Sequence, residues 1–269
     1  MLLVLAMPYY VRTRRKRVVK LPDGREIDFG VWDLRDFIQP RCNASTEIYV
    51  GAFSRLVSEF DSVRDLVNKI GLHNVLVKYA WNIVNVEVKY RYDDPVFNVP
   101  DYWLLANETW SQRHGDCEDS SFLLESVIEH ILEIDGSGDP SARSYAVIGY
   151  YYDGQQYYGH AWVLYRSDKI VPKDRWAWIE TTLEEEVPQH IWFLWRPEDL
   201  VPVYWFNSRE SYRILEDYEV LGLDEEYIET HRGAIDAMIA YVETGKRLKV
   251  KWMHKGRRTP KVVETIYVA

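Results

Sequence analysis

The stretch Cys117–Ile134 reads CEDSSFLLESVIEHILEI and precedes two segments, Ser144–Tyr152 (SYAVIGYYY) and Tyr157–Tyr165 (YYGHAWVLY). In the first stretch the apolar residues recur every three or four positions, which predicts an amphipathic helix with one buried face. The later segments look like strands, and the turn-forming sequence DGQQ between them predicts a β-hairpin. A helix followed by an antiparallel sheet is typical of the α+β class.

Three segments before this unit also show the helical spacing of apolar residues, which predicts further helices. Gly71 follows the second of them and is the expected C-cap, because glycine accepts the backbone conformation that ends many helices. The three segments are Thr46–Phe60, Ser62–Ile70 and Leu72–Val84.

Strand-like segments and a long loop complete the predicted central core, residues 46–207. Val86–Tyr92 alternates as a short strand, and the Asp-Asp-Pro sequence that follows predicts a loop running to about His114. Arg175–Thr181 is expected to be a further strand after the hairpin. The core therefore combines helices with an antiparallel sheet.

The two ends of the chain differ in pattern from this core. Val11–Phe29 alternates around the turn sequence LPDG, which predicts a hairpin in an N-terminal extension, residues 1–45. Residues 208–269 are expected to form a C-terminal extension, in which an amphipathic helical region, Arg209–Gly245, precedes a hairpin at Leu248–Val268.

Both extensions are rich in basic residues, although the net charge of the chain is -9. Basic clusters can bind nucleic acid, but these alternate with apolar residues as solvated strand faces do, and no nucleic-acid-binding motif accompanies them. Nucleic acid is therefore a possible partner that is not favoured. The clusters are Arg12, Arg14, Arg15, Lys16, Arg17 and Lys20, and Lys246, Arg247, Lys249, Lys251, Lys255, Arg257, Arg258 and Lys261.

The composition predicts an ordered, soluble protein, because 47% of the residues are hydrophobic and 28% are charged. The apolar opening Met1–Met7 is far shorter than the ~20 residues that span a bilayer, and no signal peptide is recognised. The two cysteines, Cys42 and Cys117, imply no disulfide framework, so a cytoplasmic, reducing compartment is expected. Abundant Glu, Arg, Tyr and Val are compatible with a thermophilic source.

Three residues in this order carry a possible nucleophilic site. Cys117 begins the predicted helix, and a helix N-terminus favours the nucleophilic thiolate. His160 lies on the second hairpin strand between Gly159 and Ala161, whose small size leaves the imidazole room to reach a sulfur. Glu180, on the following strand, could fix the imidazole by accepting a hydrogen bond from its far nitrogen. The three provide a nucleophile, a base and an orienting carboxylate.

The sequences around these residues resemble motifs of the transglutaminase-like superfamily, especially its bacterial and archaeal cysteine-proteinase-like branch. The resemblance extends over roughly residues 46–207. It implies a papain-like core, in which the catalytic helix packs on an antiparallel sheet, and a Cys117, His160 and Glu180 triad. The family most often has Asp where this chain has Glu180. The matching motifs are GDCEDS at 115–120, GHAWV at 159–163 and WIETT at 178–182.

The resemblance also suggests residues that support the chemistry. Leu104 stands where relatives often have Gln, so the oxyanion would rely on the Cys117 backbone N–H and the Trp103 indole. The residues expected along the oxyanion or substrate groove are Tyr102, Trp103 and Trp162, and those expected to support the helix start are Asp116 and Asp119.

The expected reaction is attack of the Cys117 thiolate on an amide of a protein or peptide, forming a thioester that passes its acyl group to water or to an amine. The motifs do not distinguish a protease or amidase from a transglutaminase. No cofactor is expected, and no metal, because the His114 and Cys117 pair has no second ligand pair. The alternative is a catalytically inactive transglutaminase-like module for binding or assembly, favoured by Glu180, Leu104 and the charged extensions.

Overall fold

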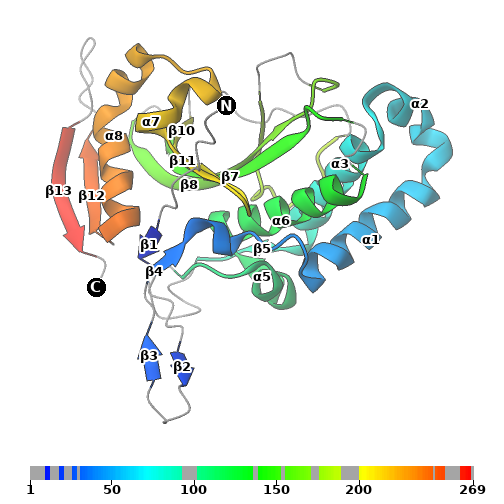
Figure 1. The fold of residues 1–269 in the computed structure, drawn as a ribbon, viewed down its shortest axis with the longest axis horizontal. Coiled ribbons are helices and arrows are strands. Elements are labelled where there is room, and N and C mark those ends of the chain that lie inside the picture. Colours follow the sequence, from blue (N-terminus) through cyan, green and yellow to red (C-terminus); the bar gives the residue numbers. More distant parts are fainter. Residues whose placement is uncertain are drawn as a thin grey trace, which may run out of the picture.

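The structure is a computed structural model of the 269-residue chain. It describes residues 10–12, 18–20, 26–28, 31–92, 102–135, 139–152, 155–170, 176–188, 200–244, 246–251 and 261–267. Its centre is a five-stranded antiparallel sheet in the order β11-β10-β7-β8-β9, with helices packed against it (Figure 1). The predicted α+β class is confirmed.

The predicted helix and hairpin form the centre of this architecture. Helix α6 (Cys117–Asp135) packs across β7 (Arg143–Tyr152) and β8 (Tyr157–Arg166). The two strands pair along their whole length, from Arg143 opposite Arg166 to Tyr152 opposite Tyr157. The central stretch of the sequence therefore folds as its periodicity predicts.

Strand β10 (Leu200–Phe206) was not predicted, although it pairs with β7 in the middle of the sheet. Pro202 lies where the pairing with β7 shifts register, and such a bulge tolerates a residue that has no N–H to donate. Opposite it, only glycine fits at position 149, because a Cβ there would collide with the backbone oxygen of Val201. The outer strands are β9 (Ala177–Ile179) and β11 (Ser211–Arg213).

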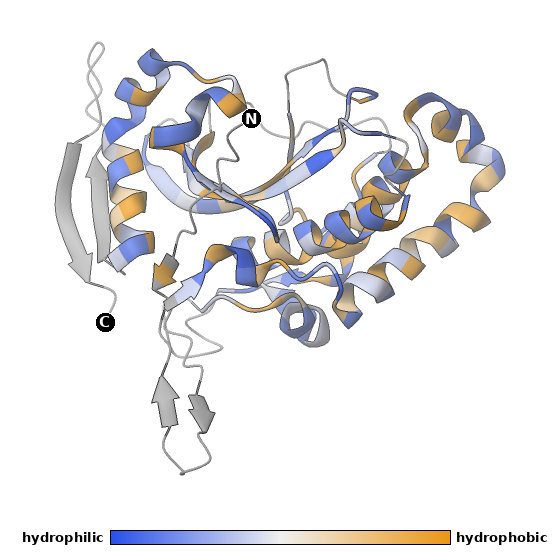
Figure 2. Cartoon of the chain, in the orientation of Figure 1, coloured by the Kyte–Doolittle hydropathy of each residue, from blue (hydrophilic) through white to orange (hydrophobic). Residues whose placement is uncertain are grey.

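Helices α1 (Asn43–Ser58), α2 (Phe60–Ile70) and α3 (Leu72–Glu87) form a layer with α6. Gly71 ends α2 with a φ of 89°, as predicted for a glycine C-cap. Figure 2 shows hydrophilic and hydrophobic residues alternating along α1 and α6, as expected of amphipathic helices that bury one face.

Two predictions for the segment after α3 were wrong. The strand expected at Val86–Tyr92 begins as the last turn of α3, and within it only β5 (Lys89–Tyr90) forms a paired strand. The loop expected to reach His114 contains helix α5 (Ala106–Gln112) and ends in β6 (His114–Gly115), which pairs parallel with β5. Alternating and helical patterns are hard to distinguish over so few residues.

The sheet lies between two apolar cores, because successive residues of a strand point to opposite faces. Val163, Tyr165 and Ile179 pack in a cluster with residues of α1, α3 and α6. Trp162 and Trp178 belong to the other cluster, which includes apolar residues of α8 and of the segment before α1.

The extensions contribute paired strands and a long helix. Strand β11 lies beyond residue 207 but forms an edge of the central sheet, so the region predicted as helical from Arg209 onward begins with a strand. Turn residues of both predicted hairpins, 21–24 and 256–258, lie outside the described residues. The N-terminal elements are β1 (Tyr10–Arg12), β2 (Val18–Lys20), β3 (Glu26–Asp28), β4 (Val31–Asp33) and η1 (Leu34–Phe37). The C-terminal elements are α7 (Ile214–Asp217), η4 (Tyr218–Leu221), α8 (Glu225–Thr244), β12 (Lys246–Lys251) and β13 (Lys261–Tyr267).

The strands in the two extensions form three antiparallel pairs. β1 pairs with β4, β2 with β3, and β12 with β13, each antiparallel. The described part of the chain contains no helix long and apolar enough to cross a membrane.

Candidate active site

Cys117 is the first residue of α6 and is 9% exposed. Its thiol donates a hydrogen bond to Glu118 Oε2 at 3.3 Å and accepts one from the backbone N–H of Ala161 on β8. The second bond brings the thiol next to the strand position that follows His160. In the described structure, the hydrogen-bond partners of the thiol are Glu118 and Ala161.

The surroundings of Cys117 favour the neutral thiol. Burial raises the pKa of Cys117 well above its usual value, and the carboxylates of Glu118 and Asp116 raise it further. The Ala161 N–H lowers it, but by less. The thiolate predicted from the helix N-terminus alone is therefore opposed, because the sequence argument did not include the burial of the sulfur.

His160 and Glu180 form the central polar pair of the site. The imidazole Nε2 lies 2.7 Å from Glu180 Oε2, and the Glu180 side chain is fully buried. The imidazole ring is stacked on Trp162, with ring centroids 6.0 Å apart. Carboxylate and indole together fix the plane of the imidazole.

The second oxygen of Glu180 is held by a tight turn. Oε1 accepts hydrogen bonds from the backbone N–H of Thr181 at 2.8 Å and of Thr182 at 2.9 Å, and from the Thr182 hydroxyl at 2.6 Å. Burial raises the pKa of Glu180, but the bonds from His160 and Thr182 outweigh it, and the net pKa is lowered. The carboxylate is therefore ionised, and the turn accommodates the methylene that Glu has beyond Asp.

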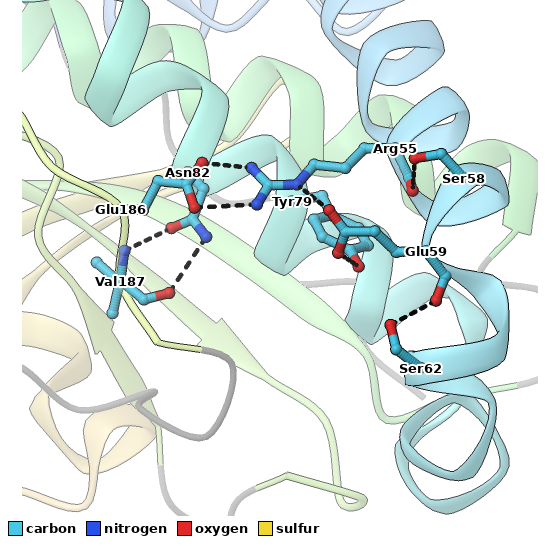
Figure 3. A network of polar contacts seen from close by, with 8 residues as sticks. All are labelled: Arg55, Ser58, Glu59, Ser62, Tyr79, Asn82, Glu186 and Val187. Atoms are coloured by element: carbon cyan, nitrogen blue, oxygen red, sulfur yellow. Dashed lines mark hydrogen bonds and ion pairs between the residues drawn. The ribbon is translucent and has the colours of Figure 1, made fainter.

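The loop after Glu180 is tied to the helical layer at several points (Figure 3). Arg55 of α1 forms a bidentate pair with Glu186, with N–O distances of 2.6 and 2.9 Å. Asn82 of α3 exchanges two hydrogen bonds with the backbone of Val187, at 3.1 and 2.9 Å. The Trp81 indole donates to the Glu180 carbonyl at 2.6 Å. These bonds fix the carboxylate through its backbone.

Asp119 accepts two backbone hydrogen bonds at the start of α6. Its Oδ2 accepts the Asp116 backbone N–H at 3.3 Å, which is the carboxylate half of a capping box, and Oδ1 accepts the Leu104 N–H at 2.7 Å. Gly115 is required beside it, because a Cβ at that position would lie 2.6 Å from the Asp119 Cβ. The backbone before Cys117 is thereby joined to the segment containing Trp103.

The aromatic residues expected along a groove differ in exposure. Tyr102 is partly exposed. Trp103 is 4% exposed and packs edge-on against Phe37 and Phe122. Trp162 has no exposed surface and is stacked between His160 and Trp178, so its role as a groove wall is corrected to one beneath the imidazole. Its large ring fills the sheet face instead of the groove.

Tyr90 is a site residue that the sequence did not reveal. It pairs with Gly115 across β5 and β6, and 36% of its surface is exposed. Burial, and then the nearby Cys117 and Asp116, raise the pKa of Tyr90, so its hydroxyl stays protonated near the thiol. Its only sequence signal was alternation in a segment interpreted as an ordinary strand.

Fold and site define an α+β protein with a buried thiol at a helix start next to an ordered His and Glu pair.

No group of three His, Cys, Asp or Glu side chains within the described ranges is arranged to hold a metal ion. No family model matches the sequence, and no curated protein matches it.

Solved structures show low similarity to the chain. Calcium-bound LapG of Legionella pneumophila is 19% identical, with a TM-score of 0.37 and coverage of 63% of this chain and 87% of LapG. EGTA-treated LapG is 18% identical, with a TM-score of 0.37, and the match covers 63% of this chain and 84% of LapG. A candidate cysteine protease from Cytophaga hutchinsonii is 16% identical, with a TM-score of 0.31, and the match covers 60% of this chain and 45% of that protein.

Proposed function

We propose that the chain is a thiol-dependent acyl-transfer enzyme of the cysteine protease or transglutaminase type, acting on amide bonds. Cys117 is the nucleophile, His160 the general base and Glu180 the orienting carboxylate. The observation that carries this proposal is the arrangement along β8. The Ala161 N–H bonds the Cys117 thiol, and the neighbouring imidazole is fixed through Nε2 by an ionised, buried carboxylate.

The roles of the two imidazole nitrogens follow from this arrangement. Because Nε2 is bound to Glu180, proton exchange with Cys117 falls to Nδ1. Hydrogen bonds in an unliganded site often become shorter only when substrate binds, so the thiol can turn from Glu118 to the imidazole in the complex. The raised pKa of Cys117 makes His160 a true base, which removes the thiol proton as the bond to carbon forms.

The reaction then proceeds in two balanced halves. The sulfur adds to the amide carbonyl, and the resulting oxyanion accepts a hydrogen bond from the Cys117 backbone N–H. One such donor stabilises the transition state by about 2.7–4 kcal/mol. The protonated imidazole gives its proton to the departing amine as the carbon–nitrogen bond breaks, which leaves a thioester. Water or a second amine, deprotonated by the imidazole, then attacks the thioester. The carbon–sulfur bond breaks, and the imidazolium returns its proton to the sulfur of Cys117.

The proposal is tested with a panel of peptide amides and glutamine donors, with and without an added primary amine. Release of free acid or ammonia reports hydrolysis, and incorporation of the amine reports transfer. We expect turnover by the wild type and none by Cys117→Ala or His160→Ala, with Cys42→Ala as the matched thiol control. Equal turnover by Cys117→Ala would overturn the proposal.

The second candidate is an inactive module that keeps the same fold for binding or assembly. The bond from the thiol to Glu118 and the raised pKa of Cys117 favour it, because both stabilise the unreactive form. The two candidates differ in one readout. A catalyst loses turnover in Cys117→Ser, whereas a binding module shows no turnover in either form and binds its partner equally well with either residue.

A further inference from the structure

The oxyanion formed when Cys117 attacks a carbonyl is stabilised by hydrogen-bond donors already in place around it. The backbone N–H of Cys117 is one such donor, because the first N–H groups of a helix have no acceptor within the helix. Trp103 is 4% exposed and packs edge-on against Phe37 and Phe122, so little of its surface can reach a substrate. Leu104 has no donor in its side chain. A second donor therefore has to come from another element.

Tyr90 lies on β5, next to the segment that leads into α6. It pairs with Gly115 across the parallel strands β5 and β6, and side chains at paired positions point to the same face. At Gly115 that face is covered by the first turn of α6, because a Cβ there would lie 2.6 Å from the Asp119 Cβ. The side chain of Tyr90 therefore extends along the face on which the first turn of α6 lies, and Cys117 begins that turn.

The environment of the Tyr90 hydroxyl agrees with this placement. Burial is the main cause that raises the pKa of Tyr90, and the largest charge effect comes from Cys117, followed by Asp116. The phenol therefore stays protonated at neutral pH and can donate a hydrogen bond. Because 36% of its surface is exposed, Tyr90 can also be reached by a substrate.

Two contacts hold Tyr90 in place. Its backbone N–H donates to Glu184 Oε1 at 2.7 Å, and its ring meets the Tyr92 ring edge-on, with centroids 5.2 Å apart. Glu184 has a φ of 55°, a left-handed conformation that is costly for residues other than glycine and that persists mainly at functional sites. Glu184 follows Glu180 by four positions in the same loop. One loop therefore positions both Tyr90 and the orienting carboxylate.

The Tyr90 hydroxyl is better placed for a substrate than for the sulfur. In the described structure, the hydrogen-bond partners of the thiol are Glu118 and Ala161. A carbonyl carbon within reach of the sulfur brings its oxygen close to the backbone N–H of Cys117, at the start of α6 that Tyr90 borders.

We propose that Tyr90 is a further catalytic residue, whose hydroxyl donates a hydrogen bond to the oxyanion alongside the Cys117 backbone N–H. The phenol keeps its proton throughout, and the hydrogen bond strengthens as negative charge develops on the carbonyl oxygen. This inference rests on the proposed function, because it needs a carbonyl that is attacked by Cys117.

The test compares two reactions of Cys117 in the wild type and in Tyr90→Phe, which keeps the ring. Acylation by p-nitrophenyl acetate passes through an oxyanion, whereas alkylation by iodoacetamide does not. We expect Tyr90→Phe to lower the acylation rate about 100–1,000-fold, as loss of one oxyanion donor typically does, and to leave the alkylation rate unchanged. Tyr92→Phe is the matched control, because Tyr92 is 68% exposed, and it should leave both rates unchanged.

A matched thionoester gives a second readout, which remains valid if Tyr90→Phe is less stable. Its sulfur accepts hydrogen bonds poorly, so it gains little from a donor. The ratio of ester to thionoester acylation rates should therefore be smaller in Tyr90→Phe than in the wild type.

The outcomes separate this inference from the proposed function. Equal acylation rates in the wild type and Tyr90→Phe, a parallel loss of alkylation, or an unchanged ester to thionoester ratio would each overturn the role of Tyr90. Wild-type acylation of Cys117 that requires His160 would still support the proposed function in those cases. Absence of Cys117 acylation in the wild type would overturn both.

Discussion

The hydroxyl oxygens of Ser121 and Thr181 lie 3.0 Å apart, and both residues are fully or almost fully buried. Ser121 is one turn after Cys117 on α6, and Thr181 directly follows Glu180. This single hydrogen bond therefore connects the helix that begins at the thiol with the turn that holds the carboxylate. It fixes the relative position of two proposed catalytic groups that are far apart in sequence.

Replacing Ser121 by Ala should loosen that connection. The bond is worth about 1 kcal/mol, and the unpaired Thr181 hydroxyl adds a comparable cost. We expect a lower free energy of unfolding in urea and a fall in kcat larger than any rise in KM. Ser62→Ala, on exposed α2, is the control. Unchanged kcat in a destabilised Ser121→Ala protein would show that the bond serves stability alone.

Glu180→Gln tests the orienting carboxylate. It keeps the shape but removes the charge, and supporting groups of this kind contribute about 10–100-fold to activity. Because the folded-state pKa of Glu180 is lowered, its contribution to stability is present above its usual value of 4.5 and is lost as pH falls through the folded pKa. The stability gap between wild type and Glu180→Gln should therefore shrink in acid. A gap independent of pH would contradict the ionised carboxylate.

The reactivity of Cys117 should follow its raised pKa. Alkylation by iodoacetamide in the absence of substrate is expected to be slow at about pH 7 and to rise steeply toward alkaline pH. Glu118→Gln removes a neighbouring negative charge that raises the pKa of the Cys117 thiol, so the rate at neutral pH should increase. Peptide mapping of Cys42 gives the internal reference. Faster alkylation of Cys117 than of Cys42 at about pH 6 would be inconsistent with a neutral resting thiol.

Glu125→Gln should stabilise the protein at neutral pH. The folded state raises the pKa of Glu125, so its stabilising proton is fully bound below the unfolded pKa and is lost as pH rises through the folded pKa. Gln keeps an acceptor for Ser144 and carries no charge. We expect a gain on the order of 1–3 kcal/mol at about pH 8, decreasing toward pH 4. A loss of stability at alkaline pH would show that the charge is compensated.

Much of the fold follows from sequence periodicity because its main elements are long and regular. Helix α6 and strands β7 and β8 have consistent patterns over their whole lengths. Strand β10 is buried along its length, as most of β7 is, and it differs from β7 in containing Pro202, which ordinarily argues against a central strand. Only the register shift opposite β7 makes the proline acceptable.

The site was predictable where chemistry depends on residue order, and unpredictable where it depends on burial. The pairing of His160 with Glu180 was expected from strand order and is present at 2.7 Å. The raised pKa of Cys117, the stacking of Trp162 beneath the imidazole and the proximity of Tyr90 each arise from tertiary packing. No local pattern in the sequence encodes these three features.

The most direct test of the proposed function is acylation of Cys117 by p-nitrophenyl acetate, followed by intact-mass and peptide mass spectrometry. This activated ester needs no knowledge of the natural substrate. We predict rapid acetylation of Cys117 ahead of Cys42, slowed about 100-fold or more in His160→Ala because the general base is lost. Acetylation of Cys117 at the same rate in His160→Ala, or no faster than that of Cys42, would contradict a thiol activated by His160.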